Sequence, residues 1–130
     1  MSQSKTVDGL WLATAPKFEV EETDAPEVGR ALLRCLSQSR TGIPHPKRED
    51  WPTLDRQLVE FLGVKSIKAF ERSALCATVS QAAGGLVTLT PTARDSTNGG
   101  FVGLSEKSIM VEGSDRRLGE ILIECLRLSK

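Results

Sequence analysis

The sequence predicts a single α+β domain, with an antiparallel or mixed sheet and about three to four helices packed on it. Strand-like and helix-like segments follow in the order strands, helix, helices, strands, helix. The later strand-like segments are joined by short turns, which favours antiparallel neighbours over a doubly wound parallel sheet. A chain of 130 residues is also long enough to bury a core without metal or disulfide support.

The start of the chain is polar. We therefore expect residues 1–8 to be a disordered tail and residues 9–130 to form the domain. Short strands are expected at residues 10–13 and 18–20, where apolar residues return. Pro16 separates these two strands, because proline interrupts a regular ladder.

One segment of thirteen residues occurs twice in altered form. Residues 28–40 align without gaps with residues 118–130, and a Gly, two Leu, a Cys and a Ser coincide. Both copies have the apolar spacing of an amphipathic helix. Gly29 and Gly119 occupy matched positions inside these helices, where Gly costs about 1 kcal/mol relative to Ala. We predict that each backbone packs closely there, against the sheet or another helix.

The first of these helices has a clear start. Thr23 or Asp24 can accept hydrogen bonds from its free N–H groups, and Pro26 fits the first turn. We expect this helix to end near Gly42, and residues 41–52 to form a loop because three prolines interrupt them.

Two further helices are expected in the middle of the chain. Thr53 can cap the first of them, and Gly63 can end it in the left-handed conformation. Ser66 can cap a shorter helix that follows directly.

The remainder of the chain alternates strands and turns. Residues 75–91 read as a hairpin with its turn at Gly84-Gly85, and residues 91–100 as a flexible surface loop. Short strands are expected at residues 101–102 and 108–112. Ser114 would then cap the last helix.

Composition excludes several classes of function. Seventeen basic and seventeen acidic residues balance, and aromatic residues are few, which argues against nucleic-acid binding. No segment reads as a signal peptide or a membrane span, and three cysteines are an odd number for a disulfide framework. We therefore expect a cytoplasmic protein that binds neither nucleic acid nor membrane.

No residue pattern indicates catalysis. The single histidine, His45, lies between prolines without an acidic or Cys neighbour, so a surface histidine is favoured over a general base or metal ligand. Cys35 and Cys125 fall on apolar helix stripes and are expected in the core; core is also preferred for Cys76. No C-x-x-C or phosphate-binding loop occurs. We predict no enzyme, cofactor or metal.

Two segments are candidate protein contacts. Residues 19–27 contain five acidic residues and no Lys or Arg, which is either a solvated segment or a docking patch for a basic partner. The second candidate is the flexible loop at residues 92–100. The candidate partner-binding residues are Glu19, Glu21, Glu22, Asp24, Glu27, Arg94, Asp95 and Asn98.

Four segments together resemble a known family. Glu27-Val28-Gly29-Arg30-Ala31-Leu32-Leu33, closing as Leu36-Ser37-Gln38-Ser39-Arg40, resembles the "G-x-A-L … L-x-x-S-R" helix of bacterial contact-dependent growth inhibition immunity proteins. The similarity continues through a "V-K-S" helix start at residues 63–70, the strand end Leu89-Thr90-Pro91 and the terminal helix at residues 114–129. It covers residues 9–130, and the order of these segments carries it.

The resemblance implies a protein that neutralises a toxin without catalysis. Such a protein binds, in the cytoplasm, the C-terminal toxin domain that a neighbouring cell delivers. Many of these toxins are nucleases, often tRNases with basic active sites, and the immunity protein blocks the active site or substrate access. A one-to-one complex is implied, and homo-oligomerisation is left open. The alternatives are an adaptor or secretion chaperone that binds another protein and, less favoured, a small enzyme dependent on His45.

Overall fold

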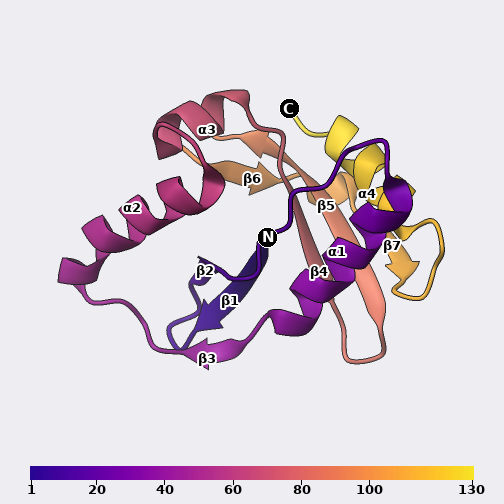
Figure 1. Cartoon of the computed structure of the whole chain (residues 1–130), viewed down its shortest axis with the longest axis horizontal. Coiled ribbons are helices and arrows are strands. Elements are labelled where there is room, and N and C mark those ends of the chain that lie inside the picture. Colours follow the sequence, from indigo (N-terminus) through magenta and orange to yellow (C-terminus); the bar gives the residue numbers. More distant parts are fainter.

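The computed structural model describes residues 1–130 and has four α-helices and two sheets (Figure 1), which confirms the α+β prediction. The strands divide into two separate sheets instead of one. The elements are β1 (Ser2–Thr6), β2 (Trp11–Thr14), α1 (Ala25–Gln38), β3 (Thr41–Ile43), α2 (Trp51–Leu62), α3 (Ile67–Ser73), β4 (Ala77–Gln81), β5 (Leu86–Arg94), β6 (Phe101–Gly103), β7 (Ile109–Glu112) and α4 (Leu118–Arg127). Short 3-10 turns lie at Arg48–Asp50 and Ser105–Lys107. No helix is long and apolar enough to cross a membrane.

The N-terminal sheet has the strand order β2-β1-β3, with β2 antiparallel and β3 parallel to β1. The prediction of a disordered tail at residues 1–8 is therefore wrong, since residues 2–6 form the middle strand. Ser2, Ser4 and Thr6 are buried on one face of this strand. Their hydroxyls bond to the side chains of Ser39, Thr14 and His45, respectively. Hydrogen-bonded hydroxyls can be buried at little cost, so this strand needs no apolar residues.

The second sheet, here called the central sheet, is built around β5. Strand β4 pairs with one edge of β5, while β7 and β6 pair with successive parts of the other edge. The hairpin predicted at residues 75–91 is confirmed, with Gly85 at φ +87° in its turn. The prediction of a loop from residue 91 is wrong for its first four residues, because β5 continues to Arg94. Pro91 lies opposite Ala77 in a pair that exchanges no N–H bond, so the ladder tolerates it.

The core lies between β5 and α4. Val87 and Leu89 of β5 and Leu118 and Cys125 of α4 form a fully buried cluster. Helix α1 adds Leu32 and Leu36 to this cluster and packs on α4. The predicted burial of Cys125 is confirmed, and that of Cys35 is confirmed on the inner face of α1. Helix α2 extends away from the central sheet at the left of Figure 1 and has no buried residue.

Helices α1 and α4 touch through their glycines, as the matched positions predicted. A Cβ built on Gly29 would lie 3.1 Å from the backbone nitrogen of Gly119. A Cβ on Gly119 would overlap the carbonyl oxygen of Ala25. Both glycines are buried. The two backbones can therefore approach this closely only because neither residue has a side chain.

The helix ends agree in part with the sequence predictions. Asp24 caps α1 by accepting a bond from the N–H of Glu27, Ser66 caps α3, and Gly63 ends α2 at φ +65°. Helix α1 ends at Gln38, short of Gly42, because residues 41–43 pair with β1 as β3.

Three local predictions are wrong. Residues 18–20 form no strand, because no strand lies beside them to complete a ladder. Helix α2 begins at Trp51 instead of after Thr53, with Pro52 in its first turn. Ser114 does not cap α4, because residues 113–117 first form a turn in which Asp115 Oδ1 accepts a bond from the N–H of Arg117 at 2.8 Å.

Replacing Gly119 by Ala is expected to lower the free energy of unfolding by roughly 3 kcal/mol or more, since the new methyl group overlaps the backbone of α1. Urea unfolding followed by circular dichroism measures this change. Gly84→Ala is the control: open space surrounds Gly84, so its stability should change by less than about 1 kcal/mol. Equal stability of Gly119→Ala and the unmodified chain would show that the helices do not cross here.

Candidate functional site

A groove of about 1210 Å³ separates β4 from the N-terminal sheet. Helix α1 supplies one wall, with the side chains of Val28, Leu32 and Leu36. The other walls come from β4, from the start of β1 with Trp11, and from the last turn of α4. We call this feature the β4 groove. It lies where Figure 1 shows the N-terminal sheet beside the β4–β5 hairpin.

Large apolar side chains are exposed in the β4 groove. Trp11 and Leu75 are each 51% exposed, although both are of a size that a protein usually buries. Phe18 and Val20, from the segment before α1, are half-buried along the same groove. A concave surface with apolar walls of this kind is typical of a binding site.

The backbone of β4 has an unpaired edge in this groove. Thr78 and Ser80 lie in the pairs that exchange hydrogen bonds with β5, because the flanking bonds run from Thr92 N–H to Cys76 C=O and from Ala82 N–H to Leu86 C=O. The N–H and C=O groups of Ala77, Val79 and Gln81 therefore point away from β5. No other strand pairs with β4.

The charged side chains of the groove are already engaged. Arg127 donates a hydrogen bond to Glu22 at 3.0 Å across the end of α4. The guanidinium of Arg40 donates to the carbonyl oxygens of Ser37 and Ser39 at 2.9 and 3.1 Å, at the end of α1. The charged side chains along the groove walls are thus each held by an ion pair or by backbone carbonyls.

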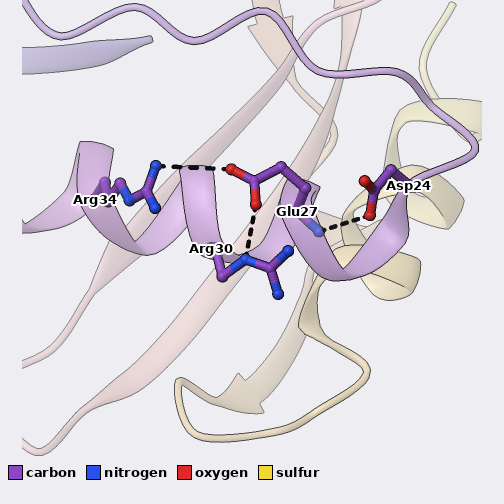
Figure 2. A network of polar contacts seen from close by, with 4 residues as sticks. All are labelled: Asp24, Glu27, Arg30 and Arg34. Carbon is purple, nitrogen blue, oxygen red and sulfur yellow. Dashed lines mark hydrogen bonds and ion pairs between the residues drawn. The ribbon is translucent and has the colours of Figure 1, made fainter.

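In the structure, three of the five acidic residues predicted as a docking patch form ion pairs with basic side chains. Glu19 pairs with Lys17 at 2.9 Å, and Glu22 pairs with Arg127. Glu27 pairs with Arg30 at 2.7 Å and Arg34 at 3.6 Å, and Figure 2 shows this network beside the Asp24 cap.

Among the five acidic residues, Glu21 is exposed and has neither an ion pair nor a side-chain hydrogen bond. Glu22 is the one that lines the β4 groove. The sequence did not indicate this groove, because its walls come from four distant parts of the chain.

The other predicted contact, the loop after β5, lies apart from this groove. Asp95 accepts hydrogen bonds from the backbone N–H groups of Thr97 and Asn98 and from the amide of Asn98, which lower the pKa of its carboxyl group. Arg94 reaches the carbonyl of Ala74 at 3.5 Å. None of Arg94, Asp95 and Asn98 lines the groove. Their polar groups bond mainly within the loop itself, which holds it in a fixed turn.

The side chain of His45 contacts three neighbouring side chains. Its Nδ1 atom is 3.2 Å from the hydroxyl of Thr6 and 3.6 Å from the carboxylate of Asp8, and its ring meets that of Trp51 edge-on. Asp8 is an acidic neighbour that the sequence did not reveal, since it lies far from His45 along the chain. Both partners approach Nδ1, and no side chain hydrogen-bonds to Nε2, so the nucleophile of a Ser–His–Asp arrangement is not in place. No group of three or more His, Cys, Asp or Glu side chains is placed to hold a metal ion.

Comparison with known proteins shows the fold. No protein-family model matches the chain, and no curated protein matches it. A protein of unknown function from Neisseria meningitidis has a similar structure, with a TM-score of 0.73 and 16% sequence identity. The similarity covers 98% of this chain and 85% of that one. At this level of identity, the similarity shows a shared fold.

Cys76 is the cysteine expected to report on the β4 groove. It lines the groove and is partly exposed, whereas Cys35 and Cys125 are buried. Burial raises the pKa of the Cys76 thiol, so less thiolate forms near pH 8 than in an unfolded peptide.

We expect iodoacetamide to modify Cys76 first, more slowly than a Cys in the unfolded chain, with the difference shrinking as pH rises above the raised pKa. Peptide mass mapping over a pH series measures this order. Modification of Cys125 before Cys76 would contradict the placement of the two thiols.

Proposed function

We propose that this chain is an immunity protein that binds and neutralises the C-terminal toxin domain of a contact-dependent growth inhibition system. It would act in the cytoplasm as a one-to-one complex and block the toxin's active site or its access to substrate. The sequence resemblance across residues 9–130 supports this proposal.

The observation that carries the proposal is the β4 groove. Its apolar walls expose Trp11 and Leu75, and one side of it is an unpaired strand edge. Exposed apolar side chains and an unpaired strand edge both lower solubility and promote association. Such features are retained where a partner covers them. They are features of a surface that binds protein, and they require no reacting side chain.

A basic nuclease, such as a tRNase, is the toxin class that we propose. Among the acidic residues around the start of α1, Glu22 lines the groove. Glu21 and Asp24 have no intramolecular ion pair, and of these two Glu21 also has no side-chain hydrogen bond. Such a charge attracts a basic partner and speeds its association more than it tightens the final complex.

An adaptor or secretion chaperone is the second candidate. The exposed apolar side chains Trp11 and Leu75 favour it as well, because a chaperone binds apolar segments of its client. A chaperone of this kind usually forms a homodimer, whereas an immunity protein binds its toxin one-to-one. Native mass spectrometry of the free chain, compared with the complex, separates the two.

Co-expression with the C-terminal domain encoded immediately upstream tests the proposal. We expect a tagged toxin domain to pull down this chain in a one-to-one ratio and its toxicity to disappear. A groove variant that leaves the charges unchanged, Trp11→Ala with Leu75→Ala, should weaken the complex because it removes apolar contact area. A toxic neighbour that this chain neither binds nor neutralises would refute the immunity function.

Replacing Glu21 by Lys should slow association with the toxin domain several-fold at low salt and reduce its salt dependence. Stopped-flow fluorescence at low and high salt gives both values. Glu106→Lys makes the same charge change at an exposed position outside the groove and is the control. If both variants associate at the same rate, steering by the acidic segment is excluded.

A further inference from the structure

We propose that an extended segment of the toxin domain enters the β4 groove and adds to the central sheet as a new strand beside β4. This inference rests on the proposed function and specifies how the partner is held. It comes from the unpaired backbone of β4, the size of the groove and the chemistry of its two faces.

The unpaired backbone groups set the pairing. Ala77, Val79 and Gln81 present N–H and C=O groups at every second position, a spacing of about 7 Å along a strand. An incoming strand that matches this spacing satisfies all of them, with no change to the ladder between β4 and β5. Strand addition of this kind derives its affinity from main-chain bonds and leaves side chains free to specify the partner.

The volume of the groove admits one strand. A five-residue strand is about 17 Å long, neighbouring strands lie about 4.8 Å apart, and packed layers about 10 Å apart, so one strand occupies roughly 800 Å³. The groove holds about 1210 Å³. This space accommodates one extended segment.

The two faces of the groove specify alternating side chains. Ala77 and Val79 lie opposite Pro91 and Leu89, so their side chains lie on the core face of the sheet. Segment residues that point this way meet α1 at Val28 and Leu32.

Residues that point the other way meet hydroxyl side chains. Thr78 and Ser80 lie on this opposite face, and Thr88 and Thr90 of β5 line the groove beside them. The expected segment therefore alternates apolar and small polar residues.

The charges of the groove do not favour a basic segment. Glu22 and Arg127 neutralise one another, and Arg40 bonds to the end of α1. A basic segment would find no free carboxylate along these walls, and its desolvation would be uncompensated. The basic residues of the toxin would then lie outside the groove, where Glu21 is exposed.

Amide-resolved hydrogen exchange tests the pairing, with the upstream-encoded toxin domain as the ligand. In the free chain, the amides of Ala77, Val79 and Gln81 should exchange fast, while those of Thr78 and Ser80 exchange slowly because they bond to β5. In the complex, the three fast amides should slow by about tenfold or more.

Each other result overturns a specific statement. A complex in which the three amides keep their fast exchange overturns strand addition and leaves the proposed function intact. Absence of a complex overturns both. Slow exchange of the same amides in the free chain, with a dimer in native mass spectrometry, assigns the edge to a second copy and also overturns this inference.

A proline placed on the free edge supplies the matched variants. Val79→Pro removes one outward N–H without removing a bond to β5, whereas Val79→Ala keeps the N–H and removes more side chain. We expect Val79→Pro to raise the dissociation constant about tenfold and Val79→Ala less than threefold. If Val79→Pro does not fold, Gln81→Pro and Gln81→Ala repeat the comparison at an exposed position. Tight binding by the proline variant would refute the pairing.

Discussion

The contact between Gly29 and Gly119 determines how the elements of this chain are placed. Because neither glycine has a side chain, α1 lies directly on α4, which in turn covers Val87 and Leu89 of β5. Helix α1 then reaches past the edge of the central sheet and contacts β1. One helix therefore holds the two sheets together and becomes the wall of the groove between them. A larger residue at Gly119 would separate the helices and remove α1 from the core at its first turns.

The N-terminal sheet is attached by a different kind of interaction. Its inner residues Ser2 and Ser4 bond through their hydroxyls to Ser39 and to the backbone N–H of Arg40, at the end of α1. Each such bond contributes on the order of 1 kcal/mol, and it is directional, whereas apolar burial is not. The sheet is thus fixed at one end of α1 without collapsing onto the apolar side of that helix. The space that remains is the β4 groove, with Trp11 at its margin.

The sequence was sufficient for features that depend on neighbouring residues. The cap at Thr23 or Asp24, the helix end at Gly63 and the turn at Gly84-Gly85 are local features that were predicted. The structure has Asp24 as the cap, Gly63 at the helix end and Gly85 with positive φ in the turn. Close backbone packing was predicted at Gly29 and Gly119, against the sheet or another helix, because Gly is costly inside a helix, and the structure shows that the two helices pack on each other. Features that depend on distant partners were missed.

Strand β1 was predicted as a tail because its buried residues are Ser and Thr, and burial of hydroxyls is decided by bonds to residues more than 30 positions away. The continuation of β5 through Pro91 depends on the register with β4, which no local pattern contains. The candidate site was predicted in part: the acidic residues were found, but their pairing was not. Lys17 pairs with Glu19 and Arg30 with Glu27 from nearby positions in the sequence, whereas Arg127, the partner of Glu22, is brought in by the fold. The groove itself has no signature in the sequence.

The pairing of these charges limits what electrostatic attraction can contribute to a complex. At physiological salt the field of an exposed charge decays over about 8 Å, and Glu19, Glu22 and Glu27 are each compensated by a cation at contact distance. Glu21 and Asp24 have no ion pair and could orient a basic partner during the encounter, but exposed charges of this kind would not supply the affinity that the proposed toxin complex requires. That affinity would have to come from desolvated apolar surface, and the β4 groove, which Glu22 lines, offers such a surface. A basic partner would then be attracted by the exposed acidic residues and held by strand pairing in the β4 groove. Glu22 lies where these two surfaces meet.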